Sequence, residues 1–215
     1  MLVVGLGNTG AEISLDLAEH GVATTISARS PVNLVRRDVL GRPTQLTALM
    51  IARLPQGLGD ALARLFRDLT VGDLRRWGIA TPRVSPMRQL REEGRTPTID
   101  VGTLAMIKSG RIAVRPGVAA FTPSGVRFTD GREEGFDAVI MATGYRPGVA
   151  ALFPDVSVPL GLREMPATIH ADGPLAGIHF IGFDIRQPGG VLRTIGLQAQ
   201  EVADTIVRDL AAARP

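Results

Sequence analysis

The chain has 215 residues, of which 45% are hydrophobic, so it can bury a core as one large domain or two small ones. It contains no cysteine, which excludes disulfides, thiolate metal sites and dithiol redox centres. The net charge is only +3, the arginines are scattered and aromatic residues make up 4%, a pattern that argues against nucleic-acid binding.

The apolar residues do not form a membrane-spanning or secretory segment. No run reaches the roughly 18 consecutive apolar residues of a spanning helix. Gly5, Gly7 and Asn8 interrupt the apolar start, which is unlike a signal peptide. We therefore expect a cytoplasmic protein without stable insertion into a membrane.

Residues 2–27 have the pattern of a βαβ unit. The β-branched run Leu2–Val4 predicts a buried parallel strand, and an apolar face recurs at helical spacing over Ala11–His20. Gly21 suits the C-terminal cap of that helix, and Thr24–Ser27 predicts the second strand. The unit has the length that a dinucleotide-binding fold requires.

Three glycines, Gly5, Gly7 and Gly10, lie between the first strand and the helix in the spacing G-x-G-x-x-G. In that motif the first glycine permits a tight turn, the second lets the backbone approach a pyrophosphate, and the third lets helix and strand pack closely. The free N–H groups at the start of the helix, together with its dipole, then hold the phosphates. The sequence therefore predicts a dinucleotide site at this turn.

The end of the second strand indicates which dinucleotide binds. NAD sites usually have Asp or Glu there to bond the ribose 2′-hydroxyl, whereas this chain has Ala28, Arg29 and Ser30 and no acid. An arginine can pair with a 2′-phosphate, and a serine hydroxyl can add a hydrogen bond. We therefore predict NADP(H), with Arg36 and Arg37 as more distant candidate phosphate contacts.

Residues 40–77 predict a helical insertion in the nucleotide-binding domain, placed at about residues 40–80. The favoured interpretation is that its apolar stripes pack on the protein's own core. The alternative is peripheral contact of this basic, leucine-rich segment with a membrane surface. The two stripes, which Pro55 separates, are Leu46, Leu49, Met50 and Leu54, and then Leu62, Leu65, Phe66 and Leu69.

Local composition predicts the next elements along the chain. Residues 82–97 are rich in Pro, Arg and Gly and predict a loop. A short helix is expected near residues 102–108, where Gly110 ends it. Strands are expected at residues 111–114, 118–122 and 126–129, the last two within a β-meander whose turns are Ser124-Gly125 and Asp130-Gly131.

A continuous apolar run over Phe136–Ala142 predicts a central parallel strand. Thr143 and Gly144 follow the carboxyl end of this strand. In open α/β sheets ligands bind at that end, so these two residues are candidate ligand contacts.

Several segments together resemble the flavin-containing monooxygenases, with the YUCCA-like branch as the nearest likeness. They are "VVGLGNTGAEISLDLAEHG", "SARSP", "DVGTLAMIKSG", "FDAVIMATGYRP", "GIHFIGF" and "GLQAQEVADTIVRDL". The resemblance implies an α/β fold. Residues 1–147 would form a Rossmann-like NADPH-binding domain with a β-meander and a helical insertion, and residues 148–215 the C-terminal return segment of a second, incomplete FAD domain.

The resemblance also implies roles for individual residues. Gly5, Gly7, Asn8, Thr9 and Gly10 would face the NADPH pyrophosphate, with Arg29 and Ser30 at the 2′-phosphate. Ala142, Thr143, Gly144 and Tyr145 would form the inter-domain crossing near both cofactors, and Gly182 and Phe183 the return loop beside FAD. In this family NADPH reduces the flavin, and a flavin hydroperoxide oxygenates a small organic substrate. The protein binds, orients and excludes water.

The sequence departs from the family pattern at its beginning. The family's first G-x-G-x-x-G, which holds FAD, and its F-x-G-x-x-x-H-x-x-x-Y fingerprint should both lie upstream of the motif at Gly5, and neither is in this sequence. We therefore expect a chain that is N-terminally truncated relative to the family. The alternative is a non-catalytic NADP(H)-binding module or remnant that needs a separate FAD-binding partner chain or a homo-oligomer.

No catalytic acid, base or nucleophile can be named from the sequence, which agrees with a reaction carried by cofactors. His20, His170 and His179 have no neighbours at metal-ligand spacing, so no metal site is predicted. A third possibility is another reductase with two dinucleotide sites, although the absence of cysteine argues against the disulfide reductases.

Overall fold

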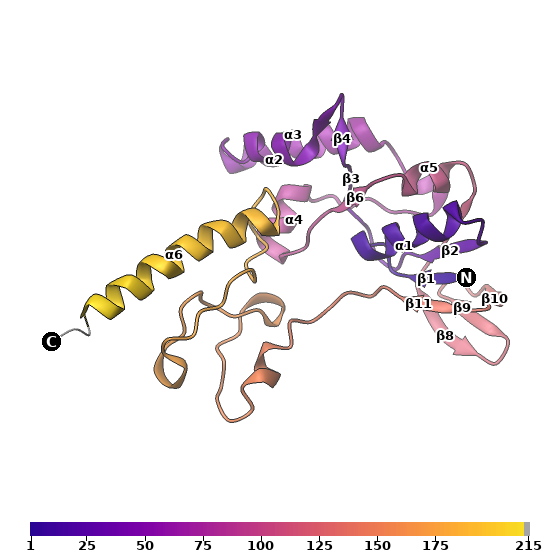
Figure 1. Cartoon of the computed structure of the whole chain (residues 1–215). Coiled ribbons are helices and arrows are strands. Elements are labelled where there is room, and N and C mark those ends of the chain that lie inside the picture. Colours follow the sequence, from indigo (N-terminus) through magenta and orange to yellow (C-terminus); the bar gives the residue numbers. More distant parts are fainter. Residues whose placement is uncertain (213–215) are drawn as a thin grey trace. The chain divides into compact units, whose positions relative to one another are not determined.

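The computed structural model describes residues 1–212 (Figure 1). The chain divides into two compact units. The first consists of residues 1–86 and 97–144, and the second of residues 87–96 together with the chain from residue 145 onward. The polypeptide therefore leaves the first unit and re-enters it before the final crossing after Gly144.

The first unit contains a four-stranded parallel sheet in the order β11-β1-β2-β7. Most residues of its strands are β-branched, as is typical of a buried parallel sheet. The predicted first strand and second strand are confirmed at the residues expected, and an α/β fold with a parallel sheet is confirmed. The strands are β1 (Leu2–Val4), β2 (Thr24–Ser27), β7 (Ile112–Arg115) and β11 (Val139–Met141).

Helix α1 (Asn8–Glu19) connects β1 to β2, and it starts three residues earlier than the apolar pattern suggested. Gly21 follows it with a φ of +78°, as expected of a glycine just beyond a helix end. Ala11, Ala18 and Ile26 lie in the buried cluster between the helices and the sheet. Helix α5 (Thr103–Lys108) joins that cluster through Leu104 and Ile107.

The predicted β-meander is confirmed. Strands β8 (Val118–Thr122), β9 (Gly125–Phe128) and β10 (Glu133–Glu134) are antiparallel neighbours in the order β10-β9-β8. Val126 and Phe128 are almost completely buried and form a small core with Leu2 of the parallel sheet. The meander therefore covers the side chains of β1 that do not face the helical core.

One expectation for the sheet was wrong. The apolar run Phe136–Ala142 forms β11 only over Val139–Met141, and β11 is an edge strand that pairs with β1 alone among the described residues. Phe136 and Val139 pack against the meander core, whereas Met141 is 59% exposed. A continuous apolar run arises in a central strand and also in an edge strand that a meander covers on one face. The length of the run does not distinguish a central strand from such an edge strand.

Residues 34–43 form three short strands, so the predicted helical segment is confirmed from Thr44 onward and not from residue 40. Strand β3 (Leu34–Arg36) pairs in parallel with β6 (Thr98–Asp100), and β4 (Asp38–Val39) forms a tight hairpin with β5 (Arg42–Pro43). Helices α2 (Thr44–Ile51) and α3 (Gln56–Val71) and the 3-10 helix η1 (Arg75–Trp77) then follow. Pro55 lies between α2 and α3 as expected.

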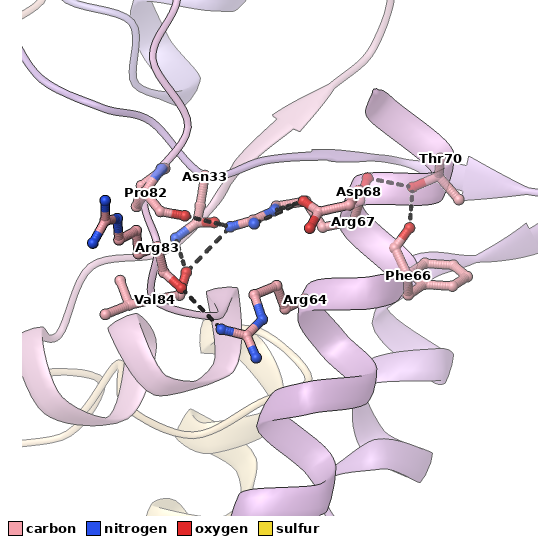
Figure 2. A network of polar contacts seen from close by, with 9 residues as sticks. All are labelled: Asn33, Arg64, Phe66, Arg67, Asp68, Thr70, Pro82, Arg83 and Val84. Atoms are coloured by element: carbon pink, nitrogen blue, oxygen red, sulfur yellow. Dashed lines mark hydrogen bonds and ion pairs between the residues drawn. The ribbon is translucent and has the colours of Figure 1, made fainter. Parts of the chain in front are cut away.

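The favoured interpretation of the apolar stripes was wrong. Helix α3 buries Gly59, Ala63, Arg67 and Val71, and Figure 2 shows Arg67 held on that side by polar contacts. Small side chains allow close packing there, and a Cβ on Gly59 would lie 3.1 Å from the carbonyl oxygen of Ile51. Of the eight residues in the two stripes, six are exposed, and Leu49 and Phe66 are half-buried. The exposed six are Leu46, Met50, Leu54, Leu62, Leu65 and Leu69.

The predicted loop over residues 82–97 was also wrong in part, because it contains helix α4 (Pro86–Glu93). Proline at the first position of a helix lacks only an N–H that has no intrahelical partner anyway. Arg88 and Glu92 then form an i,i+4 ion pair of 2.8 Å on its exposed side. Proline-rich composition therefore concealed a helix start.

The second unit is built mainly from turns and one long helix. It contains the 3-10 helices η2 (Val149–Leu152), η3 (Leu162–Glu164) and η4 (Gly173–Leu175), and α6 (Val191–Ala212). In its described part, β-pairing is limited to the isolated bridges Leu160–Pro166 and His170–His179. Its core contains Val149, Val158, Leu175 and Phe180. Among residues 1–212, no helix is long and apolar enough to cross a membrane.

Candidate dinucleotide site

At two of the three motif glycines, contacts within the protein leave no room for a side chain. Gly5 has a φ of +117°, and a Cβ there would collide with the carbonyl oxygen of Ala142. A Cβ on Gly10 would collide with the carbonyl oxygen of Gly5. The N–H of Gly5 donates to Ser27 (2.9 Å) and the N–H of Ala142 to Val4 (2.9 Å), so the turn is fixed between β2 and β11. Gly5 and Gly10 therefore permit the tight turn and the close approach of α1 to the sheet.

Gly7 differs from its two neighbours in the motif. A Cβ built on Gly7 meets no atom within 4 Å, and its φ of −88° is open to any residue. No contact within residues 1–212 therefore requires glycine at this position. The space beside Gly7 is where a pyrophosphate would approach the backbone in a dinucleotide site.

The start of α1 is suited to an anion. Gly7 is the N-cap and provides no side-chain cap, and the first turn of the helix contains no acidic residue. The first N–H groups of a helix have no intrahelical acceptor, and the helix dipole adds partial positive charge there. Asn8, Thr9 and Gly10 thus present main-chain donors beside the open space at Gly7.

A distant segment, residues 97–99, holds this turn in place, and no local sequence pattern predicted that contact. The side-chain oxygen of Asn8 accepts from the N–H of Ile99 (2.7 Å), and its Nδ2 donates to the carbonyl of Pro97 (3.4 Å). The buried Thr98 hydroxyl donates to the carbonyl of Leu6 (3.0 Å). The side chain of Asn8 is therefore a structural anchor, which leaves its main-chain N–H for a phosphate.

Arg29 and Ser30 lie just beyond the carboxyl end of β2, and both are exposed. The stem of Arg29 runs over Gly117, where a Cβ would lie 3.0 Å from Cγ of the arginine. Among the described residues Arg29 makes no ion pair with a carboxylate. Its guanidinium is thus available to a 2′-phosphate.

The more distant arginines are engaged elsewhere. Nε of Arg36 donates to the carbonyl of Thr70 (2.8 Å), and Arg37 pairs with Asp38 at 2.7 Å. Both are exposed, so these contacts are readily exchanged with solvent. Arg29 is therefore the stronger of the candidate phosphate contacts.

The "ATGY" residues extend from the edge of the sheet to the boundary between the two units. Ala142 contacts the glycine turn, since a Cβ on Gly10 would lie 3.3 Å from its own Cβ. Gly144 has a φ of +98°, and Thr143 beside it is exposed. Tyr145 is the first residue of the second unit on this side and is 87% exposed. The motif therefore includes the point where the chain leaves the first unit.

Gly182 and Phe183 lie in the second unit. The N–H of Gly182 donates to the side-chain oxygen of Gln198 on α6 (2.8 Å), and Gln198 is only 7% exposed. Phe183 packs edge-to-face on Phe180, with 6.2 Å between the ring centres. Gln198 was not singled out by sequence reasoning, because one glutamine in an amphipathic helix is not a distinctive signal.

Charged and histidine side chains near the return loop have local partners. Hydrogen bonding to Arg186 lowers the pKa of Asp184, while partial burial opposes that shift. Nδ1 of His170 and Nδ1 of His179 lie 2.9 Å apart, and Nε2 of His170 lies 3.4 Å from a carboxylate oxygen of Glu201. Within residues 1–212 no group of three or more His, Cys, Asp or Glu side chains is arranged to hold a metal ion.

A parallel sheet with a glycine turn at the start of the helix after its first strand is the arrangement found in the dinucleotide-binding class of proteins. Residues 1–160 match the model of the flavin-binding monooxygenase-like family. Since this match covers more than half of the chain, the chain belongs to that family, whose cofactors are FAD and NADPH.

Relatives in plants have similar sequences. The chain is 34% identical over 207 residues to the probable indole-3-pyruvate monooxygenase YUCCA7 of Arabidopsis thaliana, which covers 95% of this chain and 48% of that protein. It is 42% identical over 156 residues to the indole-3-pyruvate monooxygenase YUCCA1 of Oryza sativa subsp. japonica, covering 72% and 38%. The chain thus spans about half the length of these curated relatives or less.

Solved structures share the fold. A flavin monooxygenase from Stenotrophomonas maltophilia, a Q193R H194T mutant, matches with a TM-score of 0.54 and 20% identity over 95% of this chain and 49% of its own. Cyclohexanone monooxygenase with bound cyclohexanone matches with a TM-score of 0.57 and 17% identity, over 95% and 53%. At these identities the likeness concerns the fold alone.

Proposed function

We propose that this chain contributes the NADP(H)-binding part of an NADPH-dependent flavin monooxygenase that oxygenates a small organic substrate. One observation carries the proposal. The space beside Gly7 is open, and no contact within the described residues explains why glycine stands at this position. The main-chain donors at the start of α1 would hold the pyrophosphate in that space. FAD, when bound, would supply the activation and transfer of oxygen.

The residues beside the turn support NADPH over NADH. Arg29 is exposed, lacks a carboxylate partner among the described residues, and is followed by the hydroxyl of Ser30. No acid stands at the end of β2 to bond a free ribose 2′-hydroxyl or to repel a 2′-phosphate. A guanidinium at this position would bind the 2′-phosphate through charge-assisted hydrogen bonds.

Residues 1–147 would then form the NADPH-binding domain and residues 148–215 the return segment of an FAD domain, with Gly182 and Phe183 beside the flavin. The second unit supports this proposal, because its described part has two isolated bridges in place of a sheet. A polypeptide segment that contains the FAD fingerprint would complete it.

The second candidate is a non-catalytic NADP(H)-binding module that requires a separate FAD-binding chain. The exposed apolar side chains of α6 favour a partner of this kind: Leu192, Leu197, Ile206, Val207 and Leu210. Both candidates share the NADP(H) site and differ in whether this chain alone retains a flavin.

Two measurements on the purified chain test these proposals. The visible spectrum reports bound flavin, and stoichiometric flavin with turnover of a small 2-oxo acid such as indole-3-pyruvate would contradict the second candidate. Thermal unfolding with added NADPH or NADH reports the cofactor, because a ligand that binds only the folded state raises the melting temperature. We expect NADPH to stabilise the chain more than NADH at equal concentration.

Substitution of Arg29 by alanine tests the phosphate contact. We expect the affinity for NADPH to fall about tenfold to a hundredfold, the range of a lost hydrogen bond to a charged group, and the affinity for NADH to stay unchanged. Arg132→Ala is the matched control, since Arg132 is an exposed arginine in a turn of the meander and pairs with Asp130. Equal losses for both cofactors would show that Arg29 does not contact the 2′-phosphate.

A further inference from the structure

Helix α3 carries a row of exposed leucines on the side that the fold does not use. Leu58, Leu62, Leu65 and Leu69 are 51%, 37%, 54% and 76% exposed. At about 100° per residue their side chains fall within an arc of roughly 60° along the helix. We call these four residues the leucine row.

The buried side of α3 explains why the row is left free. Gly59, Ala63, Arg67 and Val71 repeat every four residues and are the buried positions of this helix. Their centre lies on nearly the opposite side of the helix, about 150° from the row. The helix thus packs mainly through small side chains and one arginine, and the leucine row lies outside that packing.

Further apolar side chains are exposed on the elements just before α3. Leu46 and Met50 of α2 are 49% and 56% exposed. Leu40 lies in the turn of the β4–β5 hairpin, where it is 99% exposed and has a φ of +51°. A large apolar side chain held in the left-handed region at a fully exposed turn is unusual, because both features are unfavourable in water.

The same segment is strongly basic. Residues 36–76 contain eight arginines and four aspartates, a net charge of +4, whereas the whole chain has a net charge of +3. Arg42, Arg53 and Arg64 make no ion pair with a carboxylate in the described part of the chain. The excess positive charge of the protein is therefore concentrated where its leucines are exposed.

We propose that the surface formed by the leucine row, Leu40, Leu46 and Met50 docks on a lipid bilayer that contains anionic phospholipid. Leucines would enter the boundary between headgroups and acyl chains, and the arginines would meet lipid phosphates. The apolar side chains lie on a hairpin and two helices, and a bilayer accepts such a surface without shape complementarity. A second copy of the chain is disfavoured as the occupant, since it would bring two basic faces together.

Sedimentation with vesicles tests the proposal on the 215-residue chain. We expect binding to vesicles of phosphatidylcholine with phosphatidylglycerol, much weaker binding to phosphatidylcholine alone, and a decrease with added salt. The double substitution Leu65→Glu and Leu69→Glu should weaken binding at least about tenfold, because it places carboxylates in the apolar surface. Leu192→Glu on α6, where the leucine is 85% exposed, is the matched control and should leave binding unchanged.

A second pair of substitutions tests the charge. Arg42→Glu with Arg53→Glu leaves every leucine in place and should abolish the preference for anionic vesicles. The proposal is overturned if the leucine-row variant binds vesicles as well as the unmodified chain. It is also overturned if light scattering shows an oligomer that ignores vesicles and dissociates on substitution of the leucine row, since a second copy would then cover this face. Neither measurement depends on NADP(H) binding.

Discussion

Nη1 of Arg67 donates to the side-chain oxygen of Asn33 over 2.5 Å, and the guanidinium side chain is only 4% exposed (Figure 2). The same nitrogen lies 3.1 Å from the carbonyl oxygens of Pro82 and Val84. Asp68 pairs with the guanidinium from the exposed side of α3 at 2.7 Å. One arginine thus joins α3 to the segment after β2 and to the loop before α4.

Arg67→Met should lower the free energy of unfolding by about 3 kcal/mol, because it removes a buried guanidinium that donates to one amide oxygen and two carbonyl oxygens. Urea denaturation followed by circular dichroism measures this loss. Arg64→Met is the matched control one turn earlier: Arg64 is exposed and its contact with the carbonyl of Arg83 is long, at 3.4 Å. That variant should lose less than about 0.5 kcal/mol, and equal losses would mean that the buried network is not the cause.

Substitutions in the glycine turn should separate effects on stability from effects on NADPH binding. Gly7→Ala should cost less than about 1 kcal/mol of stability, because the added Cβ meets no atom of the chain. It should weaken NADPH binding roughly tenfold or more, because the Cβ occupies the space that a pyrophosphate needs. Isothermal titration with NADPH measures the affinity.

Gly5→Ala should behave in the opposite way. It introduces a side chain at a φ of +117° that collides with Ala142, and should lower stability by about 2 kcal/mol or more. Thermal unfolding of the two variants gives the comparison. If Gly7→Ala keeps full NADPH affinity, the proposed position of the pyrophosphate is wrong.

Gln198 should stabilise the return loop through one buried hydrogen bond. Gln198→Met removes the acceptor of the Gly182 N–H, and we expect a loss of about 1 kcal/mol with faster hydrogen exchange at the Gly182 amide. Gln200→Met, on the exposed side of the same helix, should change neither quantity. Unchanged exchange at Gly182 in the Gln198 variant would contradict the role given to this contact.

Asp73 gives a prediction for pH. Hydrogen bonds from Arg75 lower the pKa of the Asp73 carboxyl from 3.8 to about 2. Since the folded-state pKa is the lower one, this contact stabilises the folded chain above pH 3.8, and the contribution is lost as the pH falls toward 2. Both residues are exposed, so the effect on stability is small.

Titration of the Asp73 carboxyl by nuclear magnetic resonance measures that pKa directly. Arg75→Ala should return it to near 3.8, whereas Arg76→Ala should change it far less, because Arg76 is the smallest of the contributions. A low pKa that survives in the Arg75 variant would mean that another group causes the shift.

Local patterns predicted the parts of the fold whose causes are local. The strand Leu2–Val4, the helix over Ala11–His20 and the strand Thr24–Ser27 each follow from a short periodic run and a glycine signal. The meander followed equally well from its turn residues. The glycine turn and the absence of an acid near Arg29 likewise identified the candidate site.

The remaining features depend on contacts between distant segments. The leucines of α3 have the spacing of a core-facing stripe, and only the packing of Gly59 and Ala63 shows that the other side of the helix is buried. Arg67 does not stand out in a basic segment until its partners from residues 33 and 82–84 are known. The hydrogen bond from Thr98 to the glycine turn could not be predicted from the sequence either, because no local pattern links Thr98 to a residue 92 positions earlier.

That hydrogen bond has a consequence for the order of events during synthesis. Four side-chain hydrogen bonds join residues 6–11 to residues 97–103, at separations of 89 to 92 positions. Contacts of such long range form late, because a large loop must close before they stabilise anything. The cofactor turn is synthesised before these partners, yet it gains its full set of supports only after Thr103 has emerged and β6 has docked.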